Sequence, residues 1–213
     1  MSGMFIVFEG IDGSGTSTQS ELLVDYFKRN GTLCYLTCEP SSGPIGNLIR
    51  QGMKGRVTFS KGENPVIVNG DLFDEQMAYL FAADRHDHLY NTVDGVINQV
   101  NSGATVISTR YFFSSYAYHC SSDEDFALVK SLNSRFPDPD LVIYMENPVE
   151  ESMKRMSSRA FSDEYENEKK LKQVKANYSK IFTEYQGEVL VVSATDSIEN
   201  IHNIIVDKIE SML

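Results

Sequence analysis

Five short apolar runs alternate with longer segments of mixed polarity along the chain. Each run is almost wholly apolar and lacks the alternation of a half-exposed strand, which predicts strands buried on both faces of a parallel sheet. The five runs occupy residues 4–8, 33–37, 105–108, 141–145 and 189–192.

The segments between these runs place apolar side chains three and four residues apart, which predicts helices. We expect helices over residues 17–29, 73–83, 89–100 and 126–136, and a last helix over residues 198–209 with Asp196 or Ser197 as its N-cap. Strands that alternate with helices predict a doubly wound α/β fold, here a five-stranded parallel sheet flanked by helices. In such folds ligands bind beyond the carboxyl ends of the strands.

Two segments break this pattern. Residues 52–70 contain four glycines and Pro65, which predicts a loop or a broken helix. Residues 157–172 are highly charged. Two interpretations of that second segment remain open, a solvated surface helix and a mobile lid over a bound nucleotide.

The charge balance limits the classes of partner. The 213 residues include 30 acidic and 19 basic side chains, for a net charge of −11, which argues against non-specific binding to nucleic acid or to an anionic membrane. No run approaches the ~20 apolar residues of a membrane span, and Cys34, Cys38 and Cys120 form no C-x-x-C pair. We expect a soluble, cytoplasmic protein with free buried thiols, in which any phosphate ligand is met by local positive charge.

A glycine-rich turn follows the first predicted strand and precedes the first predicted helix. Such a turn directs backbone N–H groups and the positive end of the helix dipole at one point, which suits a phosphate. The pattern G-x-x-x-x-G-K-[ST] is met except that Thr16 replaces the lysine, and Ser17 keeps the hydroxyl that binds Mg²⁺. We expect ATP phosphates to bind at Gly10, Gly13, Ser14, Gly15, Thr16, Ser17 and Thr18.

Several motifs, in the same order along the chain, resemble the thymidylate kinase family. The sequence LFAADR at residues 80–85 is the most specific of them, and TCEP at residues 37–40 resembles the family's TREP with cysteine in place of arginine. Residues 110–118 resemble all of DRYxxSSxAY except its first position, where Thr109 replaces the expected aspartate, and His119 stands where a glutamine often follows. Residues 8–15 are similar to the family's phosphate loop, residues 44–50 to the helix that follows its TREP segment, and residues 139–145 to its fourth strand.

This resemblance implies a single P-loop kinase domain over residues 1–213 that transfers the γ-phosphoryl group of ATP to dTMP, giving dTDP for dTTP synthesis. It also implies Mg²⁺ as the metal that accompanies ATP, and a homodimer.

The resemblance further implies substrate contacts. Asp12 would hydrogen-bond the deoxyribose 3′-hydroxyl, Phe81 would stack on thymine, and Arg85 would donate to its O4. Further substrate-binding residues on the same basis are Glu39, Arg50, Arg110, Ser115, Tyr118 and His119.

Arg50 and Arg110 would clamp the acceptor phosphate, because a planar guanidinium gives bidentate contact. Tyr118 would disfavour a ribose 2′-hydroxyl, Ser115 would contact the base, and Glu39 would hold a metal or its water shell.

The resemblance also places a lid at about residues 148–168. Arg155 and Arg159 are four residues apart, so both can point at the phosphates from one helical face, and with Arg110 they are the expected catalytic residues. A solvated cationic pair remains the alternative for Arg155 and Arg159.

Three functions stay open. The first is a working but divergent thymidylate kinase. The second is a kinase for another nucleotide or nucleoside, which Cys38, Thr109 and His119 favour. The third is a degenerate nucleotide-binding regulatory protein, because phosphoryl transfer depends on charges that Thr16 and Thr109 no longer supply.

Overall fold

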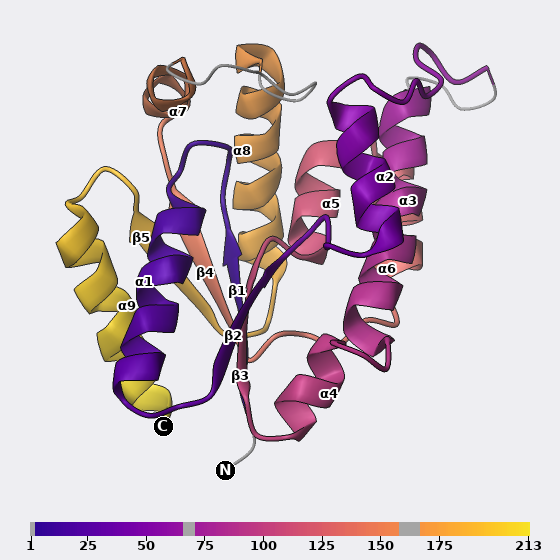
Figure 1. Cartoon of the computed structure of the whole chain (residues 1–213). Coiled ribbons are helices and arrows are strands. Elements are labelled where there is room, and N and C mark those ends of the chain that lie inside the picture. The colour runs from indigo at the N-terminus through magenta and orange to yellow at the C-terminus, as the bar shows by residue number, and fades with distance from the viewer. Residues whose placement is uncertain (1–2, 66–70, 158–166) are drawn as a thin grey trace.

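The computed structural model describes residues 3–65, 71–157 and 167–213. Five parallel strands form one sheet in the order β2-β3-β1-β4-β5 (Figure 1). Each predicted strand is present with its bounds shifted by about one residue, and the doubly wound α/β fold is confirmed. The strands are β1 (Phe5–Glu9), β2 (Cys34–Cys38), β3 (Thr105–Thr109), β4 (Leu141–Glu146) and β5 (Val189–Ser193).

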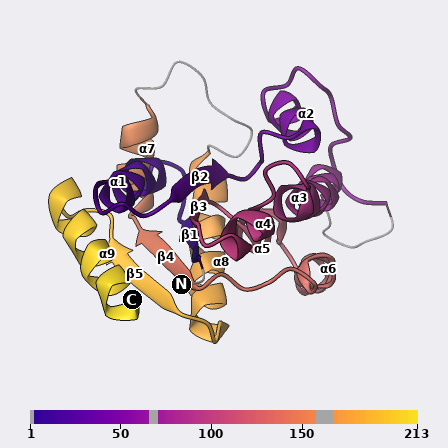
Figure 2. The same cartoon turned by 60° about the horizontal axis from the view of Figure 1, so that its bottom comes forward.

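Strand β1 lies at the centre of the sheet, and its side chains alternate between two cores. Ile6 and Phe8 belong to a core beneath α1 (Thr16–Arg29) and α9 (Ile198–Met212). Phe5 and Val7 belong to the other core, on the face covered by α5 (Phe112–His119) and α8 (Glu168–Glu184). Figure 2 shows α1 and α9 together on one side of the sheet.

The two outer strands depart from the expected burial. All residues of β1 are buried, whereas Tyr35 and Leu36 on β2 are 42% and 43% exposed and Val191 on β5 is 54% exposed. An outer strand has a neighbour on one side only, and the flanking helices do not extend over it fully. Burial on both faces is therefore correct for the central strands and wrong for β2 and β5.

The remaining helices lie on the other face of the sheet and beyond its end (Figure 1). The largest helix–helix packing joins α5 to α8, and α3 packs against α2, α4, α5 and α6. Their bounds are α2 (Pro44–Met53), α3 (Leu72–Tyr90), α4 (Val96–Asn101), α5 (Phe112–His119), α6 (Asp123–Asn133), α7 (Val149–Met156) and α8 (Glu168–Glu184).

One predicted helix, over residues 89–100, is wrong. Helix α3 continues to Tyr90, the chain turns, and α4 begins only at Val96. The Asn91 side chain accepts hydrogen bonds from the backbone N–H groups of Val93 and Asp94, both at 2.9 Å, which favours a turn over a continuing helix. Apolar spacing alone does not reveal this turn.

The other irregular segments are partly described. Helix α2 ends at Met53 and a loop continues to Pro65, which fits the expected break, while residues 66–70 lie outside the described residues. Of the expected lid, residues 158–166 also lie outside them.

Ser197 is the N-cap of α9, which is one of the two predicted caps. Cys34 and Cys120 are buried free thiols, whereas Cys38 is half-buried. No helix in the described part of the chain is both long and apolar enough to cross a membrane.

Candidate active site

The turn between β1 and α1 forms one wall of a cavity of about 550 Å³. The loop residues that line it are Gly13, Ser14, Gly15, Thr16, Ser17 and Thr18. The Ser14 hydroxyl is buried and has no hydrogen-bond partner in the described structure, which fits a site that a phosphate oxygen completes. Gly15, with φ of 97°, is the N-cap of α1, so the first N–H groups of the helix face the cavity.

Gly10 does not line this cavity, in contrast to the prediction. A Cβ atom at Gly10 would lie 2.5 Å from the Ser14 hydroxyl oxygen and 2.8 Å from the Met145 carbonyl oxygen. Gly10 therefore allows the loop to pack against β4.

Arg155 on α7 reaches the phosphate loop. Its guanidinium donates to the Gly13 carbonyl at 3.1 Å and to the Ala194 carbonyl at 2.8 Å, and the residue lines the cavity. Arg155 is exposed, and it lies at the cavity wall where the predicted lid arginine would stand, so its role stays a prediction. The second predicted lid arginine, Arg159, lies outside the described residues.

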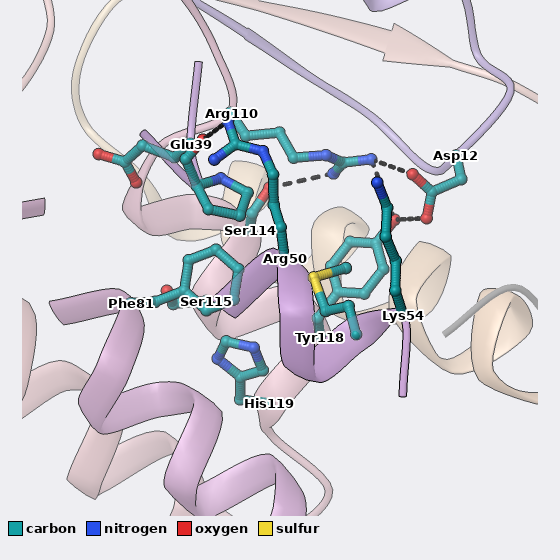
Figure 3. Close-up of a pocket in the computed structure, with 12 residues that line it drawn as sticks. Asp12, Glu39, Arg50, Lys54, Phe81, Arg110, Ser114, Ser115, Tyr118 and His119 are labelled. Atoms are coloured by element: carbon teal, nitrogen blue, oxygen red, sulfur yellow. Dashed lines mark hydrogen bonds and ion pairs between the residues drawn. The ribbon is translucent and has the colours of Figure 1, made fainter. Parts of the chain in front are cut away.

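A second cavity of about 340 Å³ adjoins the first at Asp12, Glu39 and Arg110, which line both. It contains every predicted substrate residue except Arg85 (Figure 3). The predicted residues that line it are Asp12, Glu39, Arg50, Phe81, Arg110, Ser115, Tyr118 and His119.

Arg110 stands between the two cavities because of its backbone. It follows β3 with φ of 71°, a left-handed conformation that is rare outside glycine, and its N–H donates to the Phe8 carbonyl at 2.8 Å. Its guanidinium donates to the Asp12 carboxylate at 2.6 Å and to the Gly10 carbonyl at 3.0 Å. The guanidinium also lies 5.0 Å from the centre of the Tyr118 ring, whose hydroxyl donates to the other Asp12 oxygen at 2.9 Å.

Glu9 supports this arrangement from below and received no role from the sequence. It is completely buried, and it accepts from the Tyr111 N–H at 2.8 Å and from the hydroxyls of Ser114 and Tyr178, both at 2.7 Å. Burial raises the pKa of Glu9, while the nearby Arg110 charge and these donors act in the opposite direction. A glutamate at the end of a buried apolar strand was the available signal, because such a charge requires nearby partners.

Arg85 is completely buried and does not line either cavity. It donates to the Glu39 carboxylate from Nε at 2.9 Å and from Nη2 at 2.6 Å, to the Ser115 hydroxyl at 3.2 Å, and to the Asn133 side chain. Glu39 and Ser115, to which Arg85 donates, both line the cavity, so Arg85 lies directly behind its wall and its contact with a base stays a prediction.

The predicted role of Glu39 as a metal ligand also differs from its observed surroundings. One oxygen of Glu39 faces Arg85, and the other lies 3.2 Å from Nδ1 of His88. In the described ranges no group of three or more histidine, cysteine, aspartate or glutamate residues is arranged to hold a metal. Glu39 instead anchors Arg85, and so joins the loop after β2 to α3.

The comparisons with known proteins identify the family. The family model for thymidylate kinase matches residues 8–205. The chain belongs to the thymidylate kinase family. It is 40% identical over 211 residues to a probable thymidylate kinase of Thermococcus onnurineus (strain NA1), covering 99% of this chain and 98% of the relative. A probable thymidylate kinase of Thermococcus kodakarensis (strain ATCC BAA-918 / JCM 12380 / KOD1) is 39% identical over 212 residues, with 99% and 98% covered.

A solved thymidylate kinase from Candida albicans shares the fold. The two structures superpose with a TM-score of 0.75 at 22% identity, covering 99% of this chain and 92% of the other. This likeness supports the architecture, whereas the family assignment rests on the sequence matches.

Two departures of this chain from the thymidylate kinase pattern meet in the first cavity, beside the phosphate loop. Thr16 and Thr109 both line it, where the pattern has a lysine and an aspartate. Arg110 and Arg155 also line this cavity, and no lysine does so among the residues that the structure describes. Positive charge at the phosphate loop therefore comes from an arginine directly after β3 and from one on α7.

One end of the second cavity is formed by neutral groups. The Phe81 and His119 rings lie 5.2 Å apart between centroids, and Ser115 is buried beside them. Burial, with the Lys170 and Arg85 charges adding to it, lowers the pKa of His119 to about 3, so the ring is neutral at physiological pH. A flat uncharged base suits this end of the cavity.

Four residues of the second cavity were missed in the sequence: Pro40, Met53, Lys54 and Ser114. Helical spacing contained the signal for two of them. Met53 and Lys54 follow Arg50 by three and four residues, so they share its face of α2. Arg50 donates to the Pro40 carbonyl at 2.6 Å and to the Ser41 carbonyl.

Proposed function

We propose that this chain transfers the γ-phosphoryl group of ATP to dTMP, giving dTDP. The observation that supports this most directly is the position of Arg110, which lines both the phosphate-loop cavity and the adjoining cavity. Phosphoryl transfer requires negative charge to be neutralised at the junction of the donor site and the acceptor site, and Arg110 places a cation there.

In this reaction an oxygen of the dTMP phosphate forms a bond to the γ-phosphorus of ATP. The bond from that phosphorus to the bridging oxygen breaks, and its electron pair leaves with ADP. Arg50 and Arg110 hold the attacking phosphate, and Arg155 serves the donor phosphates from the phosphate loop. Catalysis is then mainly positioning and electrostatic stabilisation, because this transfer asks little covalent chemistry of the protein.

The residues at the phosphate loop fit Mg²⁺ bound together with ATP. Ser17 is exposed and lines the phosphate cavity, so its hydroxyl is available as a ligand. Mg²⁺ takes few protein ligands at such sites and completes its shell with water and substrate phosphates. When bound, it neutralises charge on the transferred group.

The acceptor is a deoxyribonucleotide with an uncharged base on this proposal. Phe81 and His119 hold the base, and the Asp12–Tyr118 hydrogen bond lies where the sugar joins the phosphate end of the cavity. The buried Tyr118 ring leaves little room for a 2′-hydroxyl. We expect dTMP to be preferred over dCMP and UMP.

We also infer that the chain works as a cytoplasmic homodimer without nucleic-acid or membrane partners. Three large apolar side chains on α2 and α3 support a dimer, since Leu48, Tyr79 and Tyr90 are 39%, 47% and 42% exposed. The net charge of −11 is unfavourable for nucleic acid and anionic lipid. Light scattering at several protein concentrations measures the oligomeric state, and a monomer throughout would contradict the dimer.

A coupled assay that detects ADP tests the proposal. The chain is given ATP–Mg²⁺ with dTMP, dCMP, UMP, dAMP or thymidine, and dTMP should show the highest kcat/KM. A preference for another acceptor would favour the second function, a kinase for a different nucleotide or nucleoside. Binding of dTMP and ATP without turnover would favour a nucleotide-binding regulatory protein, the function that Thr16 and Thr109 support.

A further inference from the structure

The second cavity, which is the acceptor site on the proposed function, contains two positive side chains that no carboxylate neutralises. Its carboxylates are Asp12 and Glu39, and each already faces an arginine: Asp12 pairs with Arg110 and Glu39 with Arg85, both at 2.6 Å. Arg50 donates to backbone carbonyls and to the Cys38 sulfur, and Lys54 has no ion pair within the described ranges. Two positive charges therefore remain unmatched in a cavity of about 340 Å³.

Lys54 lies on the same face of α2 as Arg50. The two residues are four apart, which is about one helical turn, and both line the cavity. Figure 3 shows the Lys54 side chain extending from α2 towards the Asp12–Arg110 pair, with Arg50 extending alongside. The Lys54 ammonium group thus points to the end of the cavity that adjoins the phosphate loop, away from Phe81 and His119.

The backbone around Lys54 is held in place by hydrogen bonds and by packing against α2. The N–H groups of Arg56 and Val57 donate to the Gln51 carbonyl at 2.8 Å and 3.1 Å, which turns the chain back on α2. Phe59 then packs against Gly52, where a Cβ atom would lie only 2.0 Å from the ring. The segment after α2 is therefore folded against the helix at the position where Lys54 ends it.

We propose that the ammonium group of Lys54 binds the phosphate of the acceptor nucleotide. This inference rests on the proposed function, because it assumes a nucleoside monophosphate in the second cavity. A phosphate monoester carries a charge near −2 at neutral pH, and the unmatched charges of Arg50 and Lys54 balance it.

The test compares dTMP with thymidine, which has the same base and sugar but no phosphate. Calorimetry gives the dissociation constants of both ligands for the unmodified chain, for Lys54→Gln and for Arg56→Gln. Arg56 is a matched control because it is exposed, two residues away, and outside the cavity. Lys54→Gln should weaken dTMP binding roughly 10- to 100-fold, the usual worth of a hydrogen bond to a charged group, and leave thymidine binding unchanged.

One further variant, Lys54→Arg, and the Arg56→Gln control separate the outcomes. Lys54→Arg should keep most of the dTMP affinity, and Arg56→Gln should change it less than about 2-fold, as a distant screened charge does. Equal weakening of dTMP and thymidine by Lys54→Gln would overturn the proposal, because it would indicate a structural role. Equal effects of Lys54→Gln and Arg56→Gln would overturn it as well, because they would indicate only the general field of the protein.

The unmodified chain separates this inference from the proposed function. If it binds dTMP more tightly than thymidine and Lys54→Gln keeps that ratio, only the role of Lys54 is wrong. If the unmodified chain shows no preference for dTMP over thymidine, the assignment of the second cavity as the acceptor site is wrong. The proposed role of Lys54 is then overturned with it.

Discussion

The Arg110 guanidinium lies 2.6 Å from the Asp12 carboxylate, and this pair forms the boundary between the two cavities. The pair brings together the end of β3 and the phosphate loop, which are almost a hundred positions apart in the chain. Parallel pairing of β1 with β3 makes this possible, because Phe8 is aligned with Thr109 and both strands end at the same edge of the sheet.

Replacement of Arg110 by alanine should lower kcat/KM for dTMP by a factor of ~30 to ~10³. This range corresponds to about 2–4 kcal/mol of lost transition-state binding, as expected for a charged contact with phosphate. Steady-state kinetics with saturating ATP–Mg²⁺ measures the effect. A variant that unfolds more easily but keeps its kcat/KM would show that Arg110 acts only by neutralising Asp12 and Glu9.

Replacement of Arg85 by methionine should destabilise the fold by about 3–5 kcal/mol, because it leaves the buried Glu39 carboxylate without its counter-charge. The resemblance gives Arg85 a contact with the base, whereas the structure shows the side chain completely buried against Glu39 and Asn133.

Urea unfolding of Arg85→Met, Glu39→Gln and the double variant tests the pair. The double variant should be more stable than Arg85→Met alone, since it removes the isolated charge. Additive losses from the two single changes would contradict a direct interaction.

Residues identified from motifs lie in local sequence patterns, whereas residues found only in the structure depend on partners far away in the chain. Apolar runs located all five strands, because a parallel sheet must bury its centre, and the glycine spacing located the phosphate loop. Glu9 and His88 carry no recognisable spacing, and their roles depend on partners about 50 to 170 positions away. Arg85 shows the opposite problem, since a motif marks the residue but does not reveal whether its side chain faces the ligand or the core.

His119 should make the fold less stable as the pH falls. Burial lowers its folded pKa to about 3 from the ordinary value of 6.5. Between these values the unfolded chain binds a proton that the folded chain does not, so stability is complete above about pH 6.5 and decreases as the pH falls towards 3.

The slope is at most ~1.4 kcal/mol per pH unit, which amounts to about 2 kcal/mol between pH 7.5 and pH 5. His119→Gln removes this contribution while keeping a polar side chain of similar reach. Urea unfolding of both forms at pH 7.5 and pH 5 should therefore show a smaller loss for His119→Gln. The same pH dependence in both forms would contradict a buried neutral imidazole.

Replacement of Arg155 by alanine should reduce kcat more than it weakens ATP binding. Arg155 is held by the carbonyls of Gly13 and Ala194 at the edge of the phosphate cavity, where charge develops on the transferred group. Lys154 is a matched control, since it is exposed on the same helix and does not line the cavity. Equal losses for Arg155→Ala and Lys154→Ala, or a loss confined to the KM for ATP, would exclude a transition-state role for Arg155.

Thr16 and Thr109 should behave as a coupled replacement. Both line the phosphate cavity, and the family pattern has a lysine at the first position and an aspartate at the second. Replacing both by threonine leaves the net charge of the site unchanged, whereas restoring one alone introduces an unbalanced charge. Thr16→Lys and Thr109→Asp should therefore each impair kcat or improve it little, while the double variant should recover activity.

A double-mutant cycle in kcat with saturating ATP–Mg²⁺ measures this coupling. An interaction energy of ~1 kcal/mol or more in favour of the double variant is the expected result, since residues that share one site usually couple by this amount. Simple addition of the two single effects would mean that the positions are independent. If the unmodified chain has no kinase activity and Thr16→Lys alone restores it, the phosphate loop has decayed, and the nucleotide-binding regulatory protein becomes the better description of this chain.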